Sequence, residues 1–384
     1  MTSYDSPFIK IVDNNAAKTI VYFSSVNVPE GKFNGTNVVD DIDANCVFLN
    51  CQGNSWYLDG IPGIGTCIEE VSKTLKNIVD QLNGEDKETF TLYFGGSMGG
   101  YGALLYGCLN NADRVIGTGV EVDLLKKDGY ASNLSKFDFE SIDLPDFLSI
   151  VSNTKANIDL VFGENSAGDY YDISPLCSFS NVTSHSIPNC GHKVPVALNN
   201  SIGMKNFINE ALLGKNPFND VDGALCKYPF VLNSLSGLIK FDPEVFVEML
   251  KKRRDLDSSV KALMHHKLGE YFHVINVQDA LYHYQLAIHF NPAFYSSYLN
   301  LSKLHLKERN IFEFRKNIDA AINLIKINNT DSLEYLYYLL ARGLVEFNKM
   351  KDALLIIDTE LRSVDSSTPL GKLIQTLIEK TDGK

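Results

Sequence analysis

The sequence FTLYFGGSMGGYGA, at residues 90–103, decides the fold of the first half of the chain. It joins an apolar run typical of a buried strand, residues 90–94, to a helical pattern that begins at Tyr101. Between them, residues 95–99 match G-x-S-x-G, in which glycines allow a strand to turn sharply into a helix around a serine. Such a turn holds the hydroxyl of Ser97 above the sheet at a helix N-terminus, where developing negative charge is stabilised. We therefore expect Ser97 to act as a nucleophile.

Around this stretch, short apolar runs alternate with helical patterns through residue 213, which predicts a mostly parallel sheet with flanking helices. The strand-like runs are residues 18–23, 46–50, 90–94, 114–122, 158–162 and 182–188, and the clearest helical patterns are 68–82 and 194–213. The segment 123–153 is charged and irregular, and we predict that it is a lid over the site. We assign residues 1–213 to one α/β catalytic domain.

The second half of the chain has a different pattern. Residues 214–236 are rich in Pro, Gly and Asn and are predicted to be a linker, whereas helical spacing dominates residues 237–384. Ala280, Tyr284, Ala287 and Pro292 follow A-x3-Y-x2-A-x4-P, which is similar to the second half of a tetratricopeptide repeat. The resemblance implies an all-α C-terminal helical-repeat domain that docks a protein or peptide. The Trp of the repeat is missing, and a plain helical bundle is the alternative.

A serine nucleophile needs a base, and a histidine is the usual one. Only two of the eight histidines lie in the first 213 residues: His185 falls within a strand-like run, whereas His192 lies in the loop that follows it. A loop at the carboxyl end of a parallel strand is able to reach Ser97, so we predict His192 as the base.

A carboxylate should orient that histidine and stabilise its charged form. The loop after residues 158–162 offers Glu164, Asp169 and Asp172. We favour Asp169, because the loop needs some length to bend back beneath the imidazole. Glu164 and Asp172 stay open as alternatives, although Asp172 also fits the cap of a helix that begins near Ile173.

The chain order Ser97, Asp169, His192, each after a strand, resembles the α/β-hydrolase superfamily over about residues 15–213. In that superfamily the N–H of the residue after the nucleophile, here Met98, forms half of an oxyanion hole. The second N–H comes from the loop after an earlier strand, and in that superfamily this loop often has the sequence His-Gly. This chain has SSV at residues 24–26 instead, so we assign the second donor to Ser25, with Val26 as the alternative.

A narrower resemblance is carried by SMGGYGA at residues 97–103 together with Trp56-Tyr57-x-x-Gly60-Ile61. These residues look similar to α/β-hydrolase-fold enzymes of bacterial surface-glycan pathways. The resemblance implies an O-acyl (acetyl) transferase or esterase that works through acyl-Ser97, with a donor such as acetyl-CoA as substrate and no resident cofactor. Trp56 and Tyr57 are candidate substrate-binding residues, and the alternative is that Trp56 packs on the helix after the serine.

Composition limits the other functions. With 35 Lys and Arg against 47 Asp and Glu, the net charge is -12, which argues against a nucleic-acid partner. No run approaches the ~18 apolar residues of a membrane span, and the start lacks a signal-peptide pattern, so we expect a cytoplasmic protein. Seven scattered Cys without a CxxC pair and the histidines of residues 265–289 predict no metal site. The alternative to an enzyme is a catalytically silent hydrolase fold that acts as an interaction scaffold.

Overall fold

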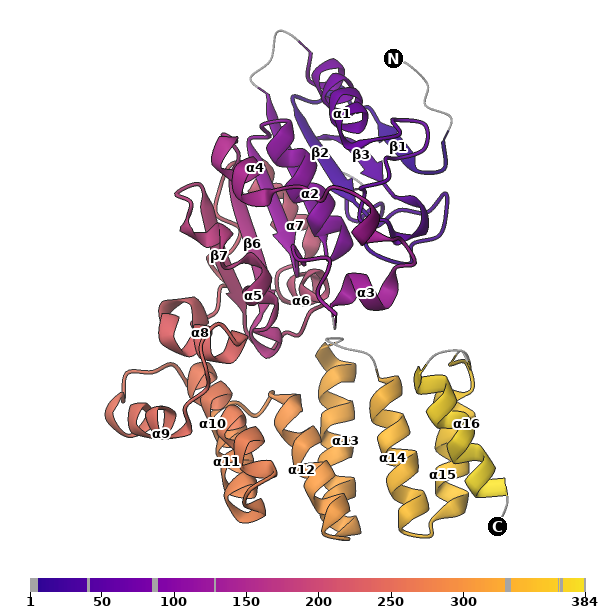
Figure 1. Cartoon of the computed structure of the whole chain (residues 1–384), viewed down its shortest axis with the longest axis vertical. Coiled ribbons are helices and arrows are strands. Elements are labelled where there is room, and N and C mark those ends of the chain that lie inside the picture. Colours follow the sequence, from indigo (N-terminus) through magenta and orange to yellow (C-terminus); the bar gives the residue numbers. More distant parts are fainter. Residues whose placement is uncertain are drawn as a thin grey trace. The chain divides into compact units, whose positions relative to one another are not determined.

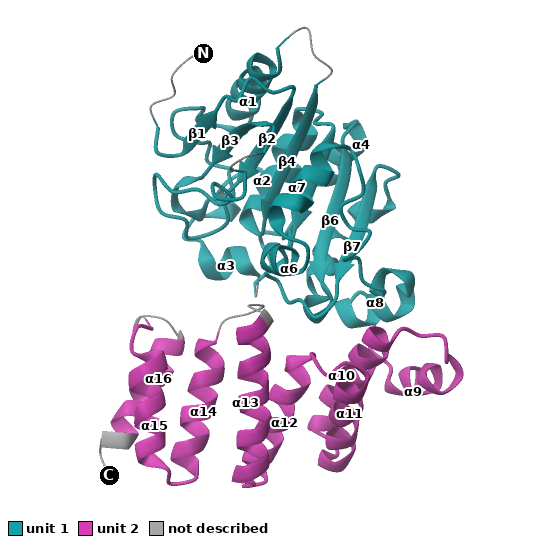
Figure 2. Cartoon of the chain, turned by 180° about the vertical axis from the view of Figure 1, so that it is seen from behind, with its two compact units in different colours: residues 1–239 teal, residues 240–384 magenta. Residues whose placement is uncertain are grey.

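The computed structural model describes residues 6–39, 42–84, 89–127, 129–328, 333–364, 366 and 369–382. The chain divides into two compact units, Met1–Ile239 and Lys240–Lys384 (Figure 2). The first unit contains helices packed on a mostly parallel sheet, and the second consists of helices in its described residues. The predicted fold class is therefore confirmed.

The sheet of the first unit has seven strands in the order β1-β3-β2-β4-β5-β6-β7 among the described residues (Figure 1). Every neighbouring pair is parallel except β1 and β3, which are antiparallel. The carboxyl ends of β2 to β7 therefore lie at one edge of the sheet. The strands are β1 (Ile9–Val12), β2 (Lys18–Phe23), β3 (Asn45–Leu49), β4 (Phe90–Gly96), β5 (Arg114–Thr118), β6 (Asn157–Gly163) and β7 (Val182–Ile187).

Helices cover both faces of this sheet, because alternate residues of its strands point to opposite sides. Phe23 of β2 stacks on Tyr106 of α2 (Met98–Leu109), with ring centroids 6.0 Å apart. On the other face, Phe94 of β4 meets Phe207 of α7 (Met204–Leu212) edge to face at 6.1 Å. The remaining long helices of this layer structure are α1 (Ile68–Asn83) and α6 (Val194–Ser201).

The predicted lid, residues 123–153, contains α3 (Tyr130–Leu134), a 3-10 turn at Phe139–Ser141 and α4 (Phe147–Asn153). Its residue 128 lies outside the described part of the chain. Phe147 packs edge to face on Tyr101 of α2, with centroids 5.0 Å apart. The segment is therefore docked on the first unit.

The structure differs from the prediction at residues 214–236, which we expected to be a linker. Phe218 is fully buried, stacks on His185 of β7 at 3.8 Å and meets Phe207 edge to face at 5.2 Å. The segment also forms α8 (Pro229–Ser236) and belongs to the first unit. Its Pro and Gly content resembles a linker, but its apolar side chains complete the core beside β7.

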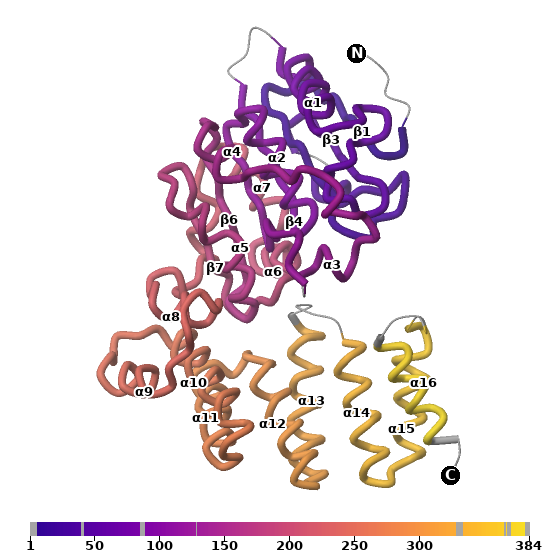
Figure 3. The backbone as a smooth tube through the Cα atoms, viewed as in Figure 1, coloured from indigo at the N-terminus to yellow at the C-terminus, as the bar shows by residue number. Residues whose placement is uncertain are grey.

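In the second unit, α10 packs on α11, α12 on α13 and α14 on α15, so consecutive helices form pairs (Figure 3). Small residues allow close packing within and between pairs: a Cβ on Gly269 of α10 would lie 2.6 Å from the ring of Tyr284 in α11. The helices are α9 (Pro243–Lys252), α10 (Ser258–His273), α11 (Val277–Phe290), α12 (Tyr295–Lys307), α13 (Ile311–Asn328), α14 (Glu334–Glu346), α15 (Met350–Ile356) and α16 (Pro369–Asp382). None of the helices in the described ranges has the length and apolar character to cross a bilayer.

Candidate active site

Ser97 occupies the sharp turn between β4 and α2, with φ 54° and ψ -123°. Its N–H donates to the carbonyl oxygen of Thr118, at the end of β5, over 2.7 Å. The two outer glycines of the motif are required by space, because a Cβ on Gly95 would collide with the carbonyl of Gly99, and one on Gly99 with the carbonyl of Phe23. The backbone therefore forms the strained elbow that the sequence predicts.

His192 lies in the loop between β7 and α6, and its two ring nitrogens face two of the predicted partners. Nε2 lies 3.2 Å from Ser97 Oγ, and Nδ1 lies 2.9 Å from Asp169 Oδ2. The imidazole is 20% exposed and the Asp169 side chain 10% exposed. The structure thus brings the three residues into one hydrogen-bonded line. This geometry has the form that acyl transfer by a serine requires.

The geometry also distinguishes among the three candidate acids. Asp169, the first residue of α5 (Asp169–Ile173), contacts His192, whereas the other two have other partners. Glu164 accepts hydrogen bonds from Ser186 Oγ and from the N–H of Leu225, each over 3.1 Å. Asp172 forms an ion pair with Lys126 at 3.1 Å. Burial raises the pKa of both Glu164 and Asp172.

The two predicted oxyanion donors, Met98 and Ser25, lie in different backbone environments. Met98 is the first residue of α2, where a helix leaves its backbone N–H groups without an intrahelical acceptor. The N–H of Ser25 donates instead to Asn34 Oδ1 over 2.8 Å, and the Ser25 hydroxyl lies 3.0 Å from the same oxygen. The assignment of Ser25 is therefore wrong for this structure, because its N–H is already engaged. Val26 stays the sequence-based alternative.

The structure contradicts the prediction that Trp56 and Tyr57 bind substrate. Both side chains are 0% exposed, and both residues have positive φ values of 51° and 63°. The Tyr57 hydroxyl donates to the carbonyl of Ser24 over 2.7 Å, and Trp56 meets Phe139 edge to face at 5.8 Å. The Trp56 ring thus joins the loop after β3 to the predicted lid, whereas Tyr57 joins that loop to the end of β2. Aromatic residues that follow a strand are expected at the surface from the sequence alone. The sequence does not reveal that the backbone here directs both side chains into the core.

One neighbour of the site belongs to no motif in the sequence. Tyr130, at the start of α3, stacks on His192 with ring centroids 3.9 Å apart and an angle of 20° between the planes. It lies within the predicted lid, and that position was the only available indication. A cavity of about 530 Å³ opens beside it and is lined by Asp169, Lys126 and Tyr171 among others.

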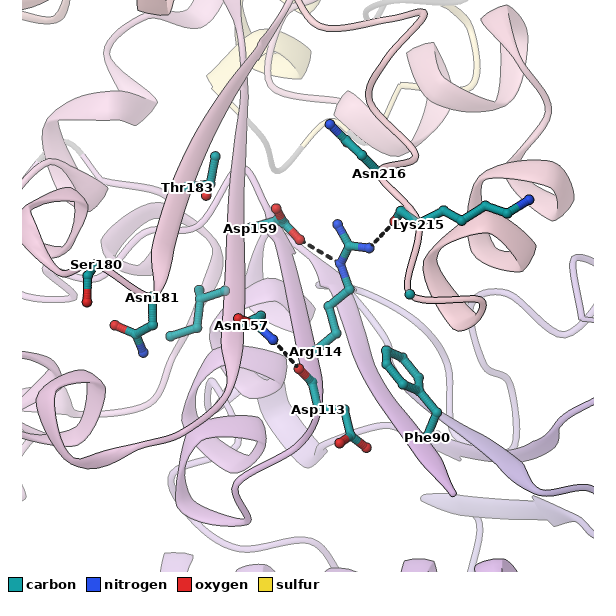
Figure 4. A pocket seen from close by; sticks show the side chains of 12 residues that line it. Phe90, Asp113, Arg114, Asn157, Asp159, Ser180, Asn181, Thr183, Lys215 and Asn216 are labelled. Carbon is teal, nitrogen blue, oxygen red and sulfur yellow. Dashed lines mark hydrogen bonds and ion pairs between the residues drawn. The ribbon is translucent and has the colours of Figure 1, made fainter. Parts of the chain in front are cut away.

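A second cavity, of about 280 Å³, lies at the opposite edge of the sheet, where β5 and β6 begin (Figure 4). Arg114 projects into the space between Asp159 and Lys215. Its Nε lies 2.7 Å from Asp159 Oδ2, and its guanidinium also donates to the carbonyl of Lys215. Asp159 thus supplies the opposite charge to Arg114, and the Lys215 carbonyl satisfies a further N–H, which fits a structural role.

The described residues contain no group of three or more His, Cys, Asp and Glu side chains placed to hold a metal ion. In the second unit, His265 Nδ1 lies 3.0 Å from His283 Nδ1. Burial lowers the pKa of His265 to about 4, so this imidazole is neutral at pH 7. The pair packs among aromatic rings, with His265 stacked on Phe290 and His283 on Phe272.

Comparisons with known proteins give only distant neighbours. No protein-family model and no curated protein matches the chain. Among solved structures, the chain is similar to the capsule O-acetyltransferase of Neisseria meningitidis serogroup A in complex with caged gadolinium, with 20% identity, coverage of 48% of this chain and 85% of that chain, and a TM-score of 0.38. MenH from S. aureus is 12% identical, with coverage of 54% and 97% and a TM-score of 0.35. At these values the likeness carries no argument about the chemistry of this chain.

Proposed function

We propose that this chain is a serine enzyme that transfers acyl groups through an acyl-Ser97 intermediate. The observation that carries the proposal is the hydrogen-bonded line from Asp169 through His192 to Ser97, with the serine on a strained elbow. A hydroxyl is a weak nucleophile on its own. This arrangement supplies both a histidine base and a carboxylate that fixes the tautomer of the histidine.

The reaction begins when Ser97 Oγ attacks the carbonyl carbon of an ester and its proton passes to His192 Nε2. The carbonyl oxygen becomes an oxyanion and accepts a hydrogen bond from the N–H of Met98, and a donor of this kind contributes about 3 kcal/mol. Collapse of the intermediate breaks the bond to the leaving group, which is an alkoxide for an ester donor and a thiolate for a thioester such as acetyl-CoA, and this group takes the proton from His192. Asp169 holds the charged imidazole in place throughout. A second hydroxyl then attacks acyl-Ser97 by the same steps in reverse.

The second hydroxyl decides the class of the enzyme. Water gives an esterase, and a sugar hydroxyl gives an O-acyltransferase. The sequence resemblance carried by residues 97–103 supports a bacterial surface glycan as acyl carrier or acceptor, acetyl as the acyl group, and acetyl-CoA as a donor substrate. We place the reaction in the cytoplasm on the sequence pattern alone.

The nucleophile is tested with a fluorophosphonate probe, which reacts covalently with an activated serine. We expect the wild-type protein to be labelled and Ser97→Ala to be unlabelled. Ser166→Ala is a matched control, because Ser166 lies in the loop that carries Asp169 but forms no part of the hydrogen-bonded line. Equal labelling of wild type and Ser97→Ala would end the assignment.

Mass spectrometry of the intact protein tests whether water or a sugar accepts the acyl group from Ser97. Incubation with acetyl-CoA or p-nitrophenyl acetate should add one acetyl group to the wild-type protein and none to Ser97→Ala. Addition of a glycan acceptor should then remove the acetyl group faster than buffer does and should yield acetylated glycan. An unchanged rate of loss with every glycan would identify an esterase instead.

We further propose that the helix pairs of the second unit are tetratricopeptide-like repeats that dock a protein partner. Paired helices, the close contact at Gly269 and the full burial of Ala280 support this proposal. If the fold were catalytically silent, docking would be its whole function. Turnover of p-nitrophenyl acetate that disappears in His192→Ala separates the two possibilities, because a scaffold has no turnover to lose.

A further inference from the structure

The imidazole of His192 is held by more than its two hydrogen bonds. The ring of Tyr130 lies nearly parallel to it, with centroids 3.9 Å apart and planes 20° apart. The backbone immediately after β5 also approaches it closely, because a Cβ on Gly119 would lie 2.9 Å from His192 Cε1. The imidazole therefore has little room to leave the line between Asp169 and Ser97.

Tyr130 is itself held by a buried carboxylate. Glu121 is 4% exposed, and its two oxygens accept hydrogen bonds from the N–H of Tyr130 over 2.7 Å and of Ala131 over 2.6 Å. The preceding Gly129 makes this approach possible, since a Cβ there would collide with Glu121 Oε1. Glu121 is the third residue after β5, so it connects the start of α3 to the end of that strand.

The far end of α3 is attached as well. The carbonyl of Leu134 accepts a hydrogen bond from Asn54 Nδ2 over 2.9 Å, and the Ser135 hydroxyl donates to the carbonyl of Asn54 over 2.8 Å. Both ends of the helix that carries Tyr130 are therefore fixed to the first unit. A ring on a helix held in this way stays against the imidazole.

We propose that Tyr130 is a positioning residue, whose ring keeps the His192 imidazole in the orientation that joins Asp169 to Ser97, and that Glu121 and Gly129 hold Tyr130 in place. This inference rests on the proposed function, since positioning matters only if His192 is the base. Displacement of a reacting group by about 1 Å costs on the order of 100-fold in rate, so a loose imidazole would be slow.

The first test replaces the ring. Tyr130→Leu should lower kcat for p-nitrophenyl acetate by roughly 10- to 100-fold while KM changes less than about twofold, and Tyr130→Phe should restore most of kcat because it retains the ring. Tyr171→Leu is the matched control: it is the same substitution at a tyrosine that is 45% exposed and lies beside the same cavity, and we expect wild-type kcat.

The second test moves the ring without changing it. Gly129→Ala should lower kcat, because the added Cβ displaces Glu121. Gly168→Ala is its control, since a Cβ there meets no atom within 4 Å. Both glycines have negative φ values, -76° and -58°, so backbone strain does not distinguish the two variants.

The stacking of Tyr130 on His192 is followed by NMR of protein that contains 13C-labelled histidine. A stacked tyrosine shifts the Cε1–H resonance of His192 upfield, and that shift should persist in Tyr130→Phe and disappear in Tyr130→Leu. His192→Ala assigns the resonance. Wild-type kcat in both Tyr130→Leu and Gly129→Ala would overturn the inference. An absence of turnover and of fluorophosphonate labelling in the wild-type protein would instead reject the proposed function, and the resonance would still report whether the ring is stacked.

Discussion

Ser97 Oγ lies 3.2 Å from His192 Nε2, although 95 residues separate the two in the sequence. The strands that precede them, β4 and β7, are not neighbours, because β5 and β6 lie between them in the sheet. The loop after β7 must therefore cross the carboxyl ends of two strands to bring the imidazole to the serine.

Glycines make that crossing possible. At the end of β6, a Cβ on Gly163 would collide with the carbonyls of Cys190 and Gly191 in the crossing loop. After β5, Gly119 has a φ of 56° and leaves space for the imidazole itself. The N–H of Asn165 also donates to the carbonyl of Cys190 over 2.9 Å. The loop thus lies directly on the strand ends, which fixes the position of His192.

Asp169 and Asp172 should respond differently to loss of their charge. Asp169→Asn should lower kcat by about 10³- to 10⁴-fold, because the amide no longer fixes the tautomer of His192. Asp172→Asn should stay within a few-fold of wild type, since Asp172 pairs with Lys126 and not with the imidazole. The measurement is kcat for p-nitrophenyl acetate with both variants at one pH. A larger loss of kcat in Asp172→Asn than in Asp169→Asn would show that the acid is not Asp169.

Trp56 is the only tryptophan of the chain and is fully buried, so its fluorescence reports on the first unit. We expect blue-shifted native emission that acrylamide quenches weakly, and a red shift when the first unit unfolds. Because the indole contacts Phe139 and no open surface, addition of a saccharide should leave the emission unchanged. A spectral shift on saccharide binding would contradict the structural role that the burial assigns to Trp56.

His185 should make the stability of the first unit depend on pH. Its ring nitrogens lie 3.0 Å from Asp159 Oδ1 and 3.1 Å from Asp222 Oδ2. Burial opposes the charged form, but hydrogen bonds to these two carboxylates outweigh it and raise the pKa of His185 above 6.5. A pKa raised in the folded state stabilises the protein fully below pH 6.5, and this stabilisation is lost as the pH rises through the folded-state value.

The test compares wild type and His185→Gln by denaturant unfolding followed through Trp56 emission. At pH 6, the variant should lose about 2 kcal/mol in the free energy of unfolding, because it removes charge-assisted hydrogen bonds to Asp159, which keeps its ion pair with Arg114, and to the partly exposed Asp222. At pH 9 the difference should be smaller, since the charged fraction of the wild-type imidazole falls as the pH rises. An equal difference at both pH values would show that the charge of His185 contributes nothing.

The sequence was sufficient for features that local physics determines. The elbow at Ser97 requires small residues on both sides, and this requirement is visible as a motif. The order of strands and loops likewise places Asp169 and His192 at one edge. The sequence was insufficient where a contact comes from another segment of the chain: Asn34 accepts the N–H of Ser25, and Phe139 packs on Trp56. Neither partner is adjacent in sequence, so no local pattern indicates it.

The boundary between the two units gives the last prediction. Residues 1–239 should fold without the helical unit and retain fluorophosphonate labelling at Ser97, because Phe218 and Leu225 remain in place and both are 0% exposed. Residues 1–213 should aggregate or unfold, since this fragment lacks the ring that covers His185 and Phe207. The measurements are soluble yield, Trp56 emission and labelling of the two fragments. A folded and labelled 1–213 fragment would mean that residues 214–236 are a linker after all, despite the buried aromatic ring within them.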